Sequence, residues 1–541
     1  MSETKKQSYL KGAAILASTV IIAKIIGAVF KIPLYNLLGD SGTTNFALTY
    51  SIYALLLTIS TSGIPVALSR QISAAASTGR PRQVKRYFSV ALPAFAFIGA
   101  VFAMLMFVFA EQLAVLMGDD ISAGIRMLSP AVFFVCVVSV YEGYGQGHGN
   151  MLPTALKQII EVTSKLLFGL AIAWWLLRQG RDMPIVAAGA ISGVSIGLGI
   201  ALVVLIVYKR KIDKAQHYRH LTSAAHDIPA GRFRTLLSIF KVSIPITIGA
   251  SFMNILTLVD YRLVLYRLQS GAGFSDEIAK VLTGVYSKAQ TIMIIPSSLI
   301  VPLSVSIIPA ISAAIANRRH REAKEVMESS LKLTNLFAMP AAAGISILSF
   351  PIFNVLFPDS HVSGPTLLTI FGAASFFICM QIISTGILQA NGFERIPMFT
   401  FPVGGIIQIV LDWFLVGNPD IGIIGSPIGT LTCYFVISAL NFIFIAMKVD
   451  NKPNFARVFV KPALCTAVMG VAAWSVYELL LRAVSGVLGG GRLGLLICLV
   501  CAIAVAVIVY GVLVIATKTV TREDMKLVPK GEKIANFLKI K

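Results

Sequence analysis

Ile72-Ser73-Ala74-Ala75 is a stretch that occurs twice in this chain, because Ile311-Ser312-Ala313-Ala314 repeats it later in the sequence. The match continues without gaps into a basic segment after each copy, where Arg80 corresponds to Arg319. Each copy directly follows an apolar stretch. The repeated stretch therefore marks the same kind of connection at two places in the chain.

A second pair of segments repeats at almost the same offset. Gln146-Gly147-His148-Gly149-Asn150 precedes Pro153, and Gln389-Ala390-Asn391-Gly392 precedes Pro397. Each echo alone is weak, but two echoes at nearly one offset indicate an internal duplication. We therefore expect two similar halves.

The composition predicts that both halves lie in a membrane. Of the 541 residues, 56% are hydrophobic and 13% are charged, and the mean hydropathy is +0.81. A soluble domain has about 25% charged residues, so a soluble enzyme, a disordered chain, a secreted disulfide scaffold and a nucleic-acid-binding domain are excluded. The sequence contains no nucleotide-binding, metal-binding or catalytic motif. We therefore expect a protein that is not an enzyme and that has no cofactor or metal.

Because a membrane-spanning helix needs about 20 apolar residues, we predict an all-α polytopic membrane protein with 14 transmembrane helices. The 14 apolar stretches are Gly12–Leu38, Thr44–Ser69, Phe88–Ala110, Ile125–Gln146, Pro153–Leu177, Pro184–Tyr208, Val242–Tyr266, Ala279–Ile311, Leu333–Phe357, Pro365–Ala390, Ile396–Val416, Ile421–Met447, Val460–Leu481 and Leu493–Thr517.

The two echoes pair the second span with the eighth and the fourth with the tenth, which cross the membrane in the same direction. This pattern predicts two six-helix lobes related by a parallel repeat, followed by two further helices. We assign residues 1–225 to the N-terminal lobe, 226–450 to the C-terminal lobe, and 451–541 to the last two helices and a basic tail. In transporters with such repeats, one half moves against the other around the substrate.

The 46 Lys and Arg residues are unevenly distributed across the predicted membrane. With an even number of spans, 33 of them lie on the side of both termini, 7 on the opposite side and 6 inside spans. Since cytoplasmic loops carry such an excess, we expect both termini in the cytoplasm. The net charge of +21 is then explained by topology and by contact with anionic membrane lipids, without a nucleic-acid partner.

Charges inside the spans are the candidate substrate-binding residues, because each costs about 2.5–3.5 kcal/mol at a helix centre. Lys24 and Lys31 lie two turns apart on one face of the first span, which contains no acid. Lys288 lies in the eighth span, which also contains no acid. Such cations would repel one another unless they met an anion. A large, partly polar anion that carries a pyrophosphate fits this charge.

Further charges inside the spans have two interpretations each. Lys157, Glu161 and Lys165 are spaced i, i+4, i+8 in the fifth span and form one helical stripe. This stripe is either self-neutralising polar packing or a charged wall of the substrate cavity. Arg262 lies near the outer end of the seventh span, and Asp260, two residues away, does not face it. Arg262 either extends to the membrane surface or joins the substrate site.

The motif Lys24-Ile25-Ile26-Gly27-Ala28-Val29-Phe30-Lys31-Ile32-Pro33 belongs to a series that resembles a known family. Leu10-Lys11-Gly12 precedes it, and Leu38-Gly39-Asp40-Ser41-Gly42 and Ser62-Gly63-Ile64-Pro65 follow it. With the segments Tyr141–Pro153 and Tyr286–Pro309, these motifs resemble the polysaccharide-transport branch of the multidrug/oligosaccharidyl-lipid/polysaccharide (MOP) exporter superfamily. Within this branch the chain looks most like the MurJ-type lipid II flippases and the related stage V sporulation protein B.

The resemblance implies a MATE-like fold and a flippase in the bacterial plasma membrane. Its expected substrate is an undecaprenyl-pyrophosphate-linked saccharide, with lipid II as the first candidate, which moves from the inner to the outer leaflet by alternating access. The resemblance implies that Lys24, Lys31 and Lys288 bind the pyrophosphate, and that the cell-wall synthesis machinery is a partner. Coupling to the membrane potential or to Na⁺ or H⁺ is expected in place of a cofactor.

Three alternatives remain at this point. In the first alternative, the substrate is another lipid-linked oligosaccharide, such as a capsule, teichoic acid or spore-cortex precursor. A multidrug/cation antiporter is less favoured, because cationic drugs require acidic groups and the first span has none. A non-transporting scaffold of a cell-wall synthesis complex would have no need of lysines inside its spans.

The predicted topology is testable by labelling. We expect cysteines introduced in the segments 80–86 and 318–324 to be protected from a membrane-impermeant reagent in intact cells, because the positive-inside rule places both segments in the cytoplasm. Cysteines in the segment 178–183 are the control, and they should be labelled from outside. Labelling of either basic segment from outside would contradict the 14-span topology.

Overall fold

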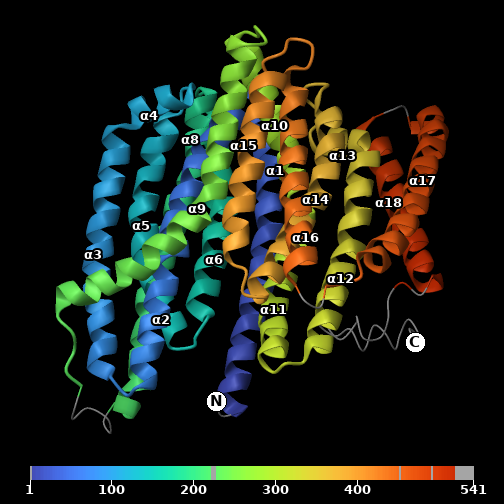
Figure 1. Cartoon of the computed structure of the whole chain (residues 1–541). Helices are drawn as coiled ribbons and strands as arrows, with labels where there is room; N and C mark the ends of the chain where they lie inside the picture. The colour runs from blue at the N-terminus through green and yellow to red at the C-terminus, as the bar shows by residue number, and fades with distance from the viewer. Residues whose placement is uncertain (1–2, 221–226, 450–451, 489–490, 518, 520–541) are drawn as a thin grey trace. The chain divides into compact units, whose positions relative to one another are not determined.

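The computed structural model describes residues 3–220, 227–449, 452–488, 491–517 and 519. Within these ranges every regular element is a helix, as predicted (Figure 1). The predicted lobe boundaries at 225/226 and 450/451, and the basic tail beyond residue 519, lie outside the described residues. The α-helices are α1 (Glu3–Ser62), α2 (Ile64–Ser77), α3 (Pro81–Val108), α4 (Ala110–Met117), α5 (Ser122–Gly147), α6 (Leu152–Ser164), α7 (Leu170–Arg178), α8 (Met183–His220), α9 (Arg232–Ser270), α10 (Asp276–Met293), α11 (Ile295–Ala316), α12 (His320–Ile347), α13 (Ser349–Leu356), α14 (Gly364–Ala390), α15 (Arg395–Leu415), α16 (Gly425–Lys448), α17 (Phe455–Leu488) and α18 (Arg492–Ala516). A π-helical turn, η1 (Lys165–Gly169), joins α6 to α7, and a 3₁₀ turn, η2 (Gly422–Ile424), precedes α16.

Fewer than 14 helices of the described chain qualify as membrane-spanning when they are judged by length and apolarity alone. In the described part of the chain, 11 helices qualify, or 12 if the bent pair α12 and α13 is one span. One cause is that the segment Ser18–Ser77, which holds most of the first predicted span and all of the second, counts once. Another is that the eighth predicted span is divided between α10 and α11. The count of 14 therefore stays a prediction.

The helix α1 turns back on itself at Gly39. This residue has a φ of 66°, outside the helical range, and glycine adopts such a left-handed conformation without the usual steric cost. In a straight helix, residues 31 and 50 would lie about 28 Å apart. Instead, the Nζ atom of Lys31 lies 5.4 Å from the centre of the Tyr50 ring. We call residues 18–38 the first arm and residues 40–62 the second arm of this hairpin.

The chain divides into two compact units, residues 1–265 and 266–541. In the first unit, α5 packs against α3 and α8, and α1 packs against α6 and α8. The part of α9 up to Leu265 also belongs to this unit, where the Asn254 side-chain amide donates to the Thr58 hydroxyl.

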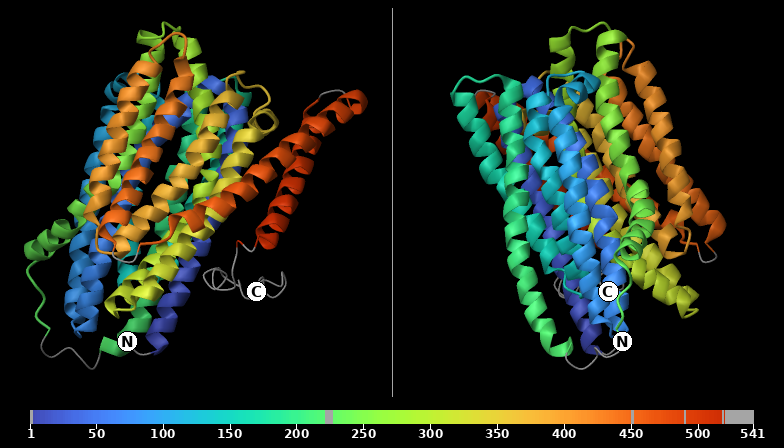
Figure 2. Two further views of the ribbon diagram at one scale, coloured as in Figure 1. Left: turned by 45° about the vertical axis from the view of Figure 1, so that its right-hand side comes forward. Right: turned by 90° about the vertical axis from the view of Figure 1, so that its left-hand side faces the viewer.

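In the second unit, α14 packs against α11, α12 and α16. The helices α17 and α18 form an antiparallel hairpin, which Figure 2 shows in red. This hairpin packs through α17 on α12 and through α18 on α13. The two helices outside the repeat are thus attached to the second unit.

The predicted internal repeat is present in the backbone. The helices α3 and α4 have 28 and 8 residues, and α12 and α13 have the same two lengths. Each pair is interrupted at a single residue, Phe109 (φ −92°, ψ 20°) or Leu348 (φ −97°, ψ 22°). These two residues are separated by the same offset as the repeated stretches of sequence. The duplicated sequence therefore specifies duplicated helix breaks.

The two repeated stretches form the same turn. Gly79 has a φ of 68° and Arg318, its counterpart, has a φ of 57°. In both copies the next backbone amide donates at 2.9 Å to the carbonyl five residues earlier, which is the Schellman pattern of a helix end. The two segments of the second echo also end in the same way, because Gly149 has a φ of 76° and Gly392 has a φ of 83°.

Arg318 carries a strain that its counterpart Gly79 avoids, because a left-handed backbone costs a non-glycine residue roughly 1–2 kcal/mol. We therefore expect Arg318→Gly to stabilise the protein by about 0.5–1 kcal/mol, after the entropy cost of glycine. Gly79→Ala is the matched reverse change and should destabilise it. Thermal unfolding of the purified protein in detergent measures both shifts, and shifts of the same sign would contradict the equivalence of the two turns.

Candidate functional site

A buried charged stripe lies on α6 in the first unit. Lys157, Glu161 and Lys165 are 7%, 4% and 6% exposed. The Glu161 carboxylate binds both lysines, with Oε2 3.1 Å from Lys157 Nζ and Oε1 2.7 Å from Lys165 Nζ. The i, i+4, i+8 spacing therefore produces the pairing that it predicts, and the stripe has one more positive than negative charge.

Two tyrosines of the second arm of α1 complete this cluster. The Tyr53 hydroxyl donates to Glu161 Oε1 at 2.7 Å. Lys165 Nζ lies 5.1 Å from the centre of the Tyr53 ring and 5.4 Å from that of Tyr50. Lys31 of the first arm lies at the same distance, 5.4 Å, from the Tyr50 ring. A cation within about 6 Å of an aromatic ring is attracted by its π-electrons, so one ring attracts two lysines.

The position of the stripe is fixed by close packing of its helix against α8. A Cβ atom added at Gly193 of α8 would lie 2.7 Å from the backbone nitrogen of Gly169, so the two backbones meet without side chains between them. Small residues allow such approach in membrane helices. Gly169 ends the π-helical turn that begins at Lys165, and π-turns are frequent at functional sites.

The first arm of α1 presents two cations and a gap between them. Lys24 is exposed and Lys31 is half-buried. Gly27 lies between them at i+3, and a Cβ atom added there would meet no atom within 4 Å. Lys24, Gly27 and Lys31 share one helical face, so the two ammonium groups flank an open position.

Arg262 lies at the end of α4 in the first unit. Its Nε atom donates to the carbonyl oxygen of Leu116 at 2.7 Å, and a cation there complements the negative end of a helix. In the second unit Arg492 donates to the Val355 carbonyl at 2.9 and 3.1 Å. Leu116 and Val355 occupy equivalent positions in α4 and α13, so an arginine caps the same position of both repeats. Asp260 is buried at 2% exposure.

Lys288 is the candidate cation of the second unit. It is buried on α10, and its Nζ atom lies 5.3 Å from the centre of the Phe357 ring. Beside it on α10, the Gln290 side-chain amide donates to the Tyr286 hydroxyl at 3.2 Å. Lys31 and Lys288 thus each lie over an aromatic ring of their own unit.

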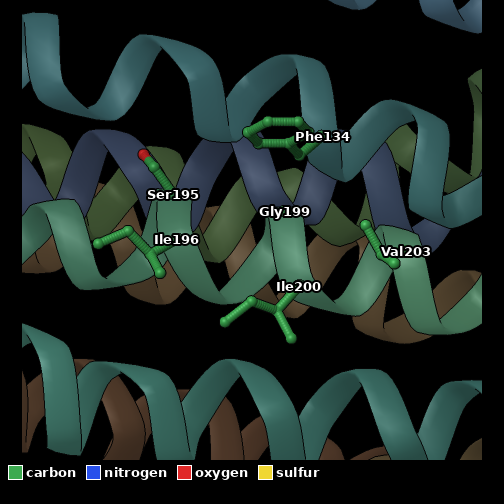
Figure 3. Close-up of a pocket in the computed structure, with 6 residues that line it drawn as sticks. All are labelled: Phe134, Ser195, Ile196, Gly199, Ile200 and Val203. Carbon is green, nitrogen blue, oxygen red and sulfur yellow. The ribbon is translucent and has the colours of Figure 1, made fainter.

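An apolar groove of about 390 Å³ lies between α5 and α8 in the first unit. Figure 3 shows Phe134 of α5 facing Ser195, Gly199 and Val203 of α8. The Ser195 hydroxyl already donates to the Met127 carbonyl at 2.7 Å. With no charged residue in its lining, the groove does not suit a polar headgroup. In the described part of the chain, no group of three His, Cys, Asp or Glu side chains is suited to a metal ion.

Residues 9–315, more than half of the chain, match the family described as polysaccharide biosynthesis protein. The chain belongs to the polysaccharide biosynthesis protein family. Among its relatives in Bacillus subtilis, the membrane protein YabM is 26% identical over 99% of this chain and 97% of its own length. Stage V sporulation protein B is 25% identical over 81% and 83% of the two chains, and lipid II flippase MurJ 23% over 86% and 87%.

Solved structures show which fold this member of the family has. A lipid II flippase MurJ in an inward closed conformation matches 92% of this chain and 99% of its own, with a TM-score of 0.67 and 17% identity. An inward-facing MATE multidrug transporter of the MOP superfamily matches 82% and 97%, with a TM-score of 0.62 and 14% identity. The fold is therefore the MATE-like fold that the sequence motifs implied.

The structure brings two of the predicted site residues, Lys31 and Lys165, to the ring of Tyr50, and a third, Glu161, binds Lys165. It places Arg262 at a helix end, and Lys24 on an exposed surface. Sequence reasoning followed charges alone and missed Tyr50 and Tyr53. The sequence does show them, since two tyrosines at i and i+3 lie on one helical face in a span without charged residues.

The charged stripe yields a stability prediction. Glu161→Ala should destabilise the protein by about 3–5 kcal/mol, because it leaves two buried lysines without their carboxylate. Lys24→Ala is the control, since Lys24 is exposed, and should leave stability within about 0.5 kcal/mol. Thermal unfolding in one detergent measures both. Equal stability of the two variants would contradict a structural role for the ion pairs.

Proposed function

We propose that this protein is a flippase that moves a lipid-linked saccharide from the inner to the outer leaflet of the bacterial plasma membrane, with lipid II as its substrate. The observation that carries the proposal is the position of Lys31, half-buried in an apolar hairpin and over the Tyr50 ring. Family membership and the similarity to MurJ and to stage V sporulation protein B support transport of a lipid-linked substrate over catalysis.

The first arm of α1 offers a binding surface for a pyrophosphate. Lys24 and Lys31 flank the open position at Gly27, and lysine binds phosphate as a point charge. An anionic group that enters from the cytoplasm would approach two cations on one helical face. Lys288 is a buried cation of the second unit, and we propose that it also acts on the substrate during alternating access.

The membrane potential favours the proposed direction. A bacterial cell is negative inside, and moving one charge across 100 mV is worth about 2.3 kcal/mol. An anionic headgroup therefore gains free energy on outward movement. The membrane potential, alone or with Na⁺ or H⁺, is the proposed driving force, and anionic membrane lipids and the cell-wall synthesis machinery are the proposed partners.

A second candidate is a flippase for another lipid-linked oligosaccharide, such as a spore-cortex precursor. It is favoured by the similarity to stage V sporulation protein B, which at 25% identity is as strong as the 23% identity to MurJ. A transport assay in which the two substrates compete distinguishes between the two candidates. Lipid II and another polyprenyl-pyrophosphate oligosaccharide are offered together to the protein in liposomes, and preferential transport of the second would replace lipid II as the substrate.

We expect Lys31→Ala to reduce flipping of fluorescent lipid II in proteoliposomes by at least about tenfold, because a charge-assisted contact to phosphate is worth about 1.5–3 kcal/mol. Lys31→Arg should retain more activity than Lys31→Ala. Lys288→Ala should lose activity to a similar degree.

The controls separate binding from folding. Gly27→Leu leaves both cations in place and meets no atom within 4 Å of its Cβ, so the protein should fold while the added side chain blocks the surface. Gly27→Ala should be nearly neutral. Normal transport by both Lys31→Ala and Gly27→Leu would refute the proposed binding surface.

A further inference from the structure

The contacts around Tyr50 connect Lys31, which is half-buried, to a network that is buried. Lys31 and Lys165 both lie 5.4 Å from the centre of the Tyr50 ring. Their ammonium groups are therefore separated by at most twice that distance. Two like charges this close repel one another in an apolar setting, so the position of Lys165 influences where Lys31 comes to rest.

Lys165 has a fixed position. The Glu161 carboxylate holds its ammonium group at 2.7 Å, and the Tyr53 ring lies 5.1 Å away. Tyr53 donates to the same carboxylate, which ties the second arm of α1 to α6. The backbone contact between Gly193 and Gly169 holds this part of α6 and η1 against α8. Each of these contacts limits the movement of Lys165.

We propose that Glu161 and Lys165 are positioning residues, which act through the ring of Tyr50 to place the Lys31 ammonium group for contact with an anionic headgroup. The argument rests on the proposed function, because it assumes that Lys31 binds the substrate. Lys165 supplies a fixed positive charge near Lys31, and Glu161 keeps that charge in place. The Tyr50 ring attracts both ammonium groups, so it links the position of Lys31 to that of Lys165.

The chain offers a matched control in Lys157. It binds the same carboxylate as Lys165, is equally buried and carries the same charge. Of the two lysines, only Lys165 lies over the Tyr50 ring in the described part of the chain. Lys157 lies at i−8 from Lys165, which is about 12 Å along the helix. A structural role predicts that the affinity of each variant follows its loss of stability, and a positioning role predicts that Lys165→Gln alone loses affinity while it stays folded.

The experiment measures the affinity of the purified full-length protein, in lipid nanodiscs, for undecaprenyl pyrophosphate. We expect Lys165→Gln to weaken binding by about tenfold, because both the fixed charge and the sharing of the ring are lost. Lys157→Gln should change the affinity by less than about twofold. Thermal unfolding should show both variants folded at the temperature of the binding assay, with the larger loss of stability for Lys165→Gln, which also loses two ring contacts. Equal losses of affinity in the two variants would overturn the proposal.

Tyr50 provides a second test that does not depend on α6. Tyr50→Phe keeps the ring and should retain more affinity than Tyr50→Leu. Tyr50→Leu removes the ring that links the two lysines and should weaken binding about as strongly as Lys165→Gln does. Because Tyr50 is half-buried, both variants are expected to fold. Unchanged affinity in Tyr50→Leu would overturn the role of the ring.

The outcomes also separate this inference from the proposed function. If the unmodified protein does not bind undecaprenyl pyrophosphate, or if Lys31→Ala binds it equally well, the proposed function fails and the positioning role fails with it. If the unmodified protein binds it and Lys31→Ala does not, while Lys165→Gln and Lys157→Gln behave alike, only the positioning role fails. Transport of lipid II by the same variants should show a raised KM for Lys165→Gln at a nearly constant kcat.

Discussion

The first unit is organised around a carboxylate that is buried in an apolar helical bundle. Glu161 is 4% exposed, and it is bound by two lysines and a tyrosine hydroxyl. A charge in such a place is costly unless its bonds are satisfied, so each partner is held in one geometry. The partners belong to two different elements, α6 with its continuation η1 and the second arm of α1. Satisfying this carboxylate therefore requires the second arm of α1 to lie against α6.

The second principle of this fold is that equal sequence offsets produce equal local structures. One constant offset relates the helix breaks at Phe109 and Leu348, the left-handed turns at Gly79 and Arg318, and the capped carbonyls of Leu116 and Val355. The caps come from outside the paired helices, because Arg262 lies on α9 and Arg492 lies at the start of α18. In each repeat, a carbonyl group at the end of the short helix thus accepts a hydrogen bond from an arginine of a later helix.

Sequence reasoning was sufficient for features that depend on local spacing. The parallel repeat follows from two echoes, and the pairing of Glu161 follows from its i−4 and i+4 neighbours on one helix. It did not reveal contacts that depend on how the chain returns on itself. Lys31 and Tyr50 lie on opposite arms of the α1 hairpin, and only the turn at Gly39 brings them together. A search for charges also passes over an aromatic ring, although a ring attracts cations.

The comparison structures also show that the fold alone does not identify the substrate, so that the side chains have to identify it. A MurJ flippase and a MATE multidrug transporter match this chain with TM-scores of 0.67 and 0.62, so one fold serves proteins with very different substrates. The charges inside the spans of this chain are therefore the evidence for its substrate. In this chain the first span contains two lysines and no acid, and the one acid of the α6 stripe is already bound by two lysines. The two lysines on the first arm of α1 would repel a cationic drug. An anionic headgroup would find two ammonium groups on one face and an open position between them.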